Sequence, residues 1–176
     1  MYHNFAELLS LCESKQVPLY EIILENEMQL TGKSGQEIYN EVKVRYGVMQ
    51  NAGLKALQKK LQTKGSLIEG NAYRHFEYAV EKGGICGRFI NVTMARALSG
   101  SEANASMSRI CAAPTAGSCG ILPSVVISLT EELDKSEKDA LDALITASGL
   151  GSVVIRNASV SGAEGGCQLE CGVAAA

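Results

Sequence analysis

Apolar residues recur at helical spacing along most of this chain, which places them on one face of a helix each time. In the first half this repeat predicts helices over residues 5–12, 18–30, 37–47, 49–60 and 71–80. Pro18 suits a first helical turn, Asn71 suits an N-cap, and Gly47 is a plausible end. The pattern therefore favours a helical protein.

The composition changes after Gly83, where Gly, Ala, Ser, Cys and Asn replace long charged side chains. Ser136 with Asp139 resembles an N-terminal capping arrangement, and Gly149 is the predicted end of that helix. Small residues let helices approach closely, so residues 151–161 are expected to form a buried helix or turn, with a strand at 152–155 as the alternative. The other helices predicted here span residues 94–98, 102–110 and 123–133.

The fold class predicted from these patterns is all-α, a single mostly helical domain over residues 1–176. Its expected parts are a helical outer layer (1–83) and a motif-rich inner part (84–176), and 46% hydrophobic residues can build its core. Residues 172–176 have high helix propensity and lack a cap, which is typical of a sequence cut inside a helix.

Charge and hydropathy exclude several classes of partner. The chain has 16 Lys+Arg against 19 Asp+Glu, with no basic stripe interleaved with aromatic residues, so we expect no nucleic-acid partner. Pro123 interrupts the apolar stretch at residues 121–129, so we expect no membrane segment. The first residues lack the pattern of a signal peptide, which predicts a cytoplasmic protein.

The six cysteines are expected to be reduced thiols that pack, bind metal or take part in chemistry. Cys167 and Cys171 would share a helix face one turn apart, as metal ligands often do. Two thiolates are too few for a tetrahedral zinc site or a cubane cluster. The residues alone leave metal binding and simple packing both open.

Two other motifs carry little chemistry. The segment 31–34 (Thr-Gly-Lys-Ser) resembles part of a phosphate loop, but Glu27 stands where that motif needs a glycine. His3 and His75 have no cysteine or carboxylate partner at ligand spacing. We therefore predict neither a nucleotide site nor a histidine-based catalytic group.

The segment 110–123 is rich in residues that shape a loop. Pro114 fixes φ, Gly117 permits unusual backbone angles, and Thr115 and Ser118 add hydroxyl groups. Such a loop can present consecutive N–H groups to an anion, and a carboxylate is a natural guest. The alternative is a tight turn between helices with its hydroxyls satisfied locally.

Residues 111–123 (Cys-Ala-Ala-Pro-Thr-Ala-Gly-Ser-Cys-Gly-Ile-Leu-Pro) and 157–172 (Asn-Ala-Ser-Val-Ser-Gly-Ala-Glu-Gly-Gly-Cys-Gln-Leu-Glu-Cys-Gly) are similar to the α chain of iron–sulfur-dependent bacterial L-serine dehydratases. Order and spacing match. The segments 65–72 and 102–107 resemble further parts of that family. The resemblance covers essentially the whole chain.

This resemblance implies a helical catalytic domain whose three cysteines hold a 4Fe–4S cluster and leave one iron open. Cys167 matches one of these ligands, and the other two fall in family segments that follow residue 176. Cys111, Cys119 and Cys171 are not assigned as ligands. No pyridoxal phosphate is implied.

The implied reaction is the elimination of water from L-serine. The open iron acts as a Lewis acid on the hydroxyl group, a base that we leave unassigned removes the α-proton, and the enamine hydrolyses to pyruvate and ammonia. Thr115, Gly117 and Ser118 are the expected substrate-carboxylate ligands.

The family also implies a β chain as partner, an oligomer, and a role in serine degradation and gluconeogenesis. A chain of this length is expected to be inactive alone. The alternative is a non-catalytic helical interaction module whose cysteines only pack.

Overall fold

The computed structural model describes residues 2–176, which form eight helices and no strand. This confirms the prediction of an all-α domain. No helix among the described residues is long and apolar enough to cross a membrane. The helices are α1 (Phe5–Lys15), α2 (Leu19–Thr31), α3 (Gly35–Gln58), α4 (Asn71–Lys82), α5 (Gly87–Ala105), α6 (Ile121–Glu132), α7 (Glu137–Asn157) and α8 (Gly162–Ala175).

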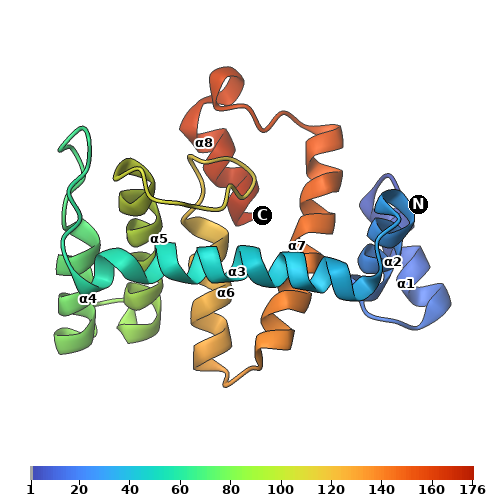
Figure 1. Ribbon diagram of the computed structural model, residues 1–176, viewed down its shortest axis with the longest axis horizontal. Coiled ribbons are helices and arrows are strands. Elements are labelled where there is room, and N and C mark those ends of the chain that lie inside the picture. Colours follow the sequence, from blue (N-terminus) through green and yellow to red (C-terminus); the bar gives the residue numbers. More distant parts are fainter. Residues whose placement is uncertain (1) are drawn as a thin grey trace.

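The long helix α3 runs along the longest axis of the molecule (Figure 1). The other helices are placed one after another along its length, and α5, α6 and α7 cross it steeply. Tyr46 and Met49 join the buried cluster with α6 and α7. Ala52 and Ala56 join an alanine-rich cluster with α4 and α5, in which small side chains permit close helix contacts. A third cluster joins α1, α2 and α7. The division at residue 83 into an outer layer and an inner part stays a prediction.

Two glycines that were expected to end helices lie inside them. Gly47 is inside α3, where buried Tyr46 and Met49 on either side stabilise a continuous helix despite the ~1 kcal/mol cost of a helical glycine. Gly149 is inside α7, where an added Cβ would lie 2.4 Å from Ile23 Cδ1. The role of Gly149 is therefore close packing of α7 on α2.

Other boundaries also differ from the sequence-based expectation. Residues 94–98 and 102–105 lie in one helix, α5, which ends at Ala105 because the chain turns at Met107 with φ +60°. Residues 106–110, expected to continue the second helix, lie outside it. The strand alternative for residues 152–155 is wrong, since α7 extends through them. Within residues 151–161 only Val153 is buried, so the expected burial of that segment is also wrong.

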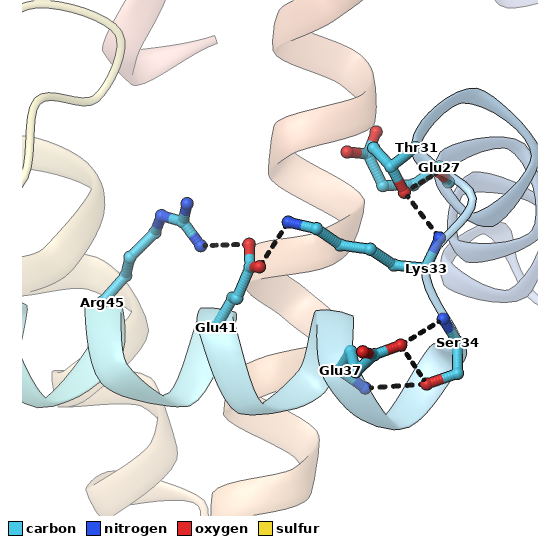
Figure 2. A network of polar contacts seen from close by, with 7 residues as sticks. All are labelled: Glu27, Thr31, Lys33, Ser34, Glu37, Glu41 and Arg45. Atoms are coloured by element: carbon cyan, nitrogen blue, oxygen red, sulfur yellow. Dashed lines mark hydrogen bonds and ion pairs between the residues drawn. The ribbon is translucent and has the colours of Figure 1, made fainter.

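Local caps explain several helix starts. Ser136 and Asp139 form a capping box at α7, as predicted, and Ser34 with Glu37 forms another at α3. Figure 2 shows this second box beside Lys33, which pairs with Glu41. The segment 31–34 is therefore a connection between helices, in which Gly32 ends α2 with φ +71°.

Two predicted helix starts shift by one residue. Pro18 occupies the N-cap position of α2, just before its first turn. Asn71 is the first residue of α4, and Gly70 occupies the N-cap position without a side-chain cap. The cap of α4 comes instead from α5, where the Glu102 carboxylate accepts hydrogen bonds from the N–H groups of Gly70, Asn71 and Ala72.

Candidate active site

The loop between α5 and α6, residues 106–120, is held directly against the backbone of α5. A Cβ added at Gly120 would lie 2.3 Å from the carbonyl oxygen of Ala97, and one added at Gly100 would lie 2.8 Å from Gly120 Cα. The Asn104 amide donates to the carbonyl of Ala116 at 2.9 Å. Because these contacts involve main-chain atoms, α5 fixes the position of the loop.

Inside this loop, Ser118 is almost fully buried and its hydroxyl is used locally. It donates to the Ala113 carbonyl at 3.1 Å and accepts from the Thr115 N–H at 3.4 Å. The Thr115 hydroxyl lies 3.2 Å from that of Ser118. The Ser118 hydroxyl therefore forms its hydrogen bonds within the loop, which is one of the two alternatives that the sequence left open. These bonds help to shape the loop.

Several main-chain N–H groups of the loop, unlike its hydroxyl groups, form no hydrogen bond with the described residues. The N–H groups of Ala116, Gly117 and Ser118 donate no hydrogen bond to another described residue, and Ala116 and Gly117 are exposed. Consecutive free N–H groups can bind an anion. Substrate-carboxylate binding by Thr115, Gly117 and Ser118 stays a prediction, and the main chain offers the donors for it.

Helix α8 carries the predicted cluster ligand. The helix is kinked at Gly166, which has φ +72° and ψ −175°, and Cys167 follows this kink with an exposed thiol. The Cys171 Sγ lies 3.7 Å from the Cys167 Sγ. The hydrogen bond with Cys167 and the negative charge of Glu170 both raise the pKa of the Cys171 thiol.

The cysteines among the described residues do not form a complete metal site. Across residues 2–176 no group of three or more His, Cys, Asp or Glu side chains converges on one point. Burial raises the pKa of the Cys111 and Cys119 thiols, which suits packing. A cubane cluster needs three or four ligands, so the residues of this chain do not fit a cluster by themselves. Cys167 as one ligand stays a prediction.

The two sequence motifs meet at Glu170, which the sequence analysis did not single out. A Cβ added at Gly117 would lie 2.4 Å from Glu170 Oε2, and one added at Gly162 would lie 2.7 Å from Glu170 Cδ. The carboxylate thus lies between a glycine of the loop and a glycine at the start of α8. Only this contact, which the sequence does not display, distinguishes Glu170 from the other acidic residues.

A cavity of about 270 Å³ adjoins this meeting point. Its walls come from α5, from the loop with the start of α6, and from α8, so that it lies where the two motifs meet. The lining includes Met94, Leu98, Ile121, Gly117, Ser118 and Cys171. Its volume suits a small molecule.

The segments 65–72 and 102–107 also come together, through Glu102. This carboxylate is 1% exposed, and its three hydrogen bonds to N–H groups satisfy the start of α4. A carboxylate at a helix N-terminus is favoured by the helix dipole as well. Its role is to join the start of α4 to α5.

The chain is similar to alpha chains of serine dehydratases. The profile of the family described as "Serine dehydratase alpha chain" matches residues 14–176. The "L-serine dehydratase, alpha chain" of Peptoniphilus asaccharolyticus is 36% identical over 176 residues, covering 100% of this chain and 60% of that protein. The "Probable L-serine dehydratase, alpha chain" of Bacillus subtilis is 34% identical, covering 99% of this chain and 58% of that protein. The chain thus spans about 60% of the length of these relatives.

Proposed function

The chain belongs to the serine dehydratase alpha chain family, and from this premise we propose that it forms part of an L-serine dehydratase, a lyase that converts L-serine to pyruvate and ammonia. The names of both alpha-chain relatives support this substrate. We further propose a cytoplasmic enzyme of serine degradation, in which this chain works with a β chain in an oligomer.

The observation that carries the proposal is the meeting of the two motifs. Residues 111–123 and 157–172 lie apart in the sequence, yet Glu170 contacts Gly117 and both segments line one cavity. A cavity of this size beside free backbone N–H groups suits a small amino acid. The segments that resemble the dehydratases therefore build one site.

The proposed reaction is a β-elimination with a simple atom balance. A base removes the Cα proton of L-serine, the Cβ–O bond breaks, and the hydroxyl group leaves as water. The resulting enamine tautomerises to an imine, which water hydrolyses to pyruvate and ammonia. In this reaction the N–H groups of residues 116–118 would bind and orient the substrate carboxylate.

We also propose that Cys167 is one ligand of a 4Fe–4S cluster. Its exposed thiol beside the kink at Gly166 is accessible to such a group. Because the chain does not hold a full ligand set, the other ligands would come from outside residues 1–176. We assign no reaction step to the cluster from this structure.

The test uses the assembled enzyme. The chain would be produced with the remaining alpha-chain length that its relatives carry and with the β chain, under anaerobic conditions with iron and sulfide. Pyruvate formation from L-serine, followed with a coupled lactate dehydrogenase assay, is the expected result. An assembled complex that forms no pyruvate would contradict the proposed function and favour a non-catalytic helical module.

A further inference from the structure

Glu170 is held in a slot made by two glycines. An added Cβ at Gly117 or at Gly162 would overlap its carboxylate group, at 2.4 Å from Oε2 and 2.7 Å from Cδ. Neither glycine has a positive φ, so the absence of a side chain serves space and not backbone conformation. The position of this carboxylate beside the loop therefore requires that both neighbouring residues lack a Cβ.

The charge of Glu170 has no cation partner among the described residues. Glu170 is a half-buried residue, and its carboxylate takes part in no ion pair or hydrogen bond with residues 2–176. Each ion pair that a Lys or Arg side chain forms among the described residues involves a carboxylate other than that of Glu170. A partly desolvated anion without a partner favours binding of a cation.

The neighbourhood of this anion defines which cation fits. The free N–H groups of residues 116–118 suit the carboxylate of a substrate, and Glu170 touches Gly117 within the same segment. In an α-amino acid the ammonium and carboxylate groups share one carbon atom. A substrate carboxylate bound at the loop would thus lie near Glu170, and an α-ammonium group between the two carboxylates would attract both and reduce their mutual repulsion.

From this juxtaposition we propose that Glu170 binds the α-ammonium group of the substrate and makes the site specific for α-amino acids. The proposal rests on the proposed function. A hydroxy acid of the same shape would bring two carboxylates together with no cation, and like charges at short range repel. Glu170 thus contributes both attraction for amino acids and rejection of hydroxy acids.

The main test compares Glu170→Gln with Glu164→Gln in the assembled enzyme. Glu164 is an exposed carboxylate on the same helix and serves as the matched control. Glu170→Gln should raise KM for L-serine about tenfold to a hundredfold, the loss expected for a charged hydrogen bond, and change kcat little. Glu164→Gln should behave as wild type.

A second measurement gives a result that a merely structural role would not. Glycerate, the hydroxy acid that matches serine, is titrated as a competitive inhibitor. It should bind Glu170→Gln more tightly than wild type, because the repulsion is gone, while L-serine binds more weakly. Glu170→Asp keeps the charge and should keep the preference for L-serine, even if the Gln variant fails to fold.

A steric variant tests the slot itself. Gly162→Ala should displace the Glu170 carboxylate and raise KM in the same direction, whereas Gly172→Ala has open space around its Cβ and should have no effect. Unchanged KM in Glu170→Gln, or a loss of kcat with KM unchanged, would overturn the proposal. A wild-type enzyme that makes no pyruvate would instead contradict the proposed function, and calorimetric titration of both ligands would still decide the role of Glu170.

Discussion

Helices α5 and α8 both contain many small residues and both contact the loop at residues 106–120, yet they are packed very differently. Seven residues of α5 are buried, including Ser99, Gly100 and Glu102, whereas no residue of α8 is buried. The polar side chains of Ser99 and Glu102 in α5 form hydrogen bonds within the fold. Those of α8, namely the Cys167 thiol and the Glu170 carboxylate, remain available. The comparison indicates a scaffold helix and a helix that presents chemical groups.

The largest expected effect is on the free energy of unfolding, at the contact between the loop and the scaffold helix α5. Gly120→Ala would force a Cβ against the Ala97 carbonyl, which is backbone and cannot rotate away. We expect a loss of about 2–4 kcal/mol in the free energy of unfolding, measured by urea denaturation. The control is Gly172→Ala on α8, which should be neutral. Equal stability of the two variants would remove the distinction between α5 and α8.

A second scaffold variant is Glu102→Gln. The carboxylate accepts hydrogen bonds from three N–H groups, and the amide would direct an NH₂ group at one of them. The expected loss in the free energy of unfolding is about 2 kcal/mol. Hydrogen exchange should show that the N-terminal turn of α4 is exposed first. Unchanged protection of that turn would contradict the assigned role.

The local features of this fold were predictable from sequence, and the long-range ones were not. The capping box at Ser136 depends only on neighbouring residues, so the sequence indicated it. Gly47 and Gly149 were misread as helix ends because the packing of α3 and α7 on distant helices decides their conformation. Helical spacing still identified most of the helices.

In the candidate site, too, the local features were predictable from the sequence and the long-range contacts were not. The loop and Cys167 stood out through their residue types and the family resemblance. The contact of Glu170 with Gly117 joins residues far apart in sequence, so no local pattern displayed it. The buried hydroxyl of Ser118 likewise became evident only from its partners in the folded loop.

Thiol accessibility should also differ between the loop packed on α5 and helix α8. Cys119 is 4% exposed and burial raises its pKa, whereas Cys167 is exposed. Iodoacetamide at neutral pH should therefore modify Cys167, together with exposed Cys86, well before Cys119. Peptide mass spectrometry over time measures the order. Early modification of Cys119 would mean that the α5 side is not the closed scaffold described above.

The smallest expected effect concerns the cap of α7. Hydrogen bonds from Ser136 lower the pKa of Asp139, so this cap contributes stability above the unfolded pKa of about 3.9 and loses it as the pH falls through the folded pKa. Ser136→Ala should lower the melting temperature slightly at neutral pH. The difference from wild type should shrink in acid. A difference independent of pH would contradict the capping box as its cause.

The proposed role of α8 is to present a cluster ligand without being needed for the core. The most direct measurement compares Cys167→Ala with Cys12→Ala in the anaerobically assembled enzyme, by iron–sulfur absorption and by pyruvate formation from L-serine. We predict that Cys167→Ala loses both signals while its unfolding transition stays as in wild type, and that Cys12→Ala keeps both. Retention of the cluster and of pyruvate formation in Cys167→Ala would contradict the account.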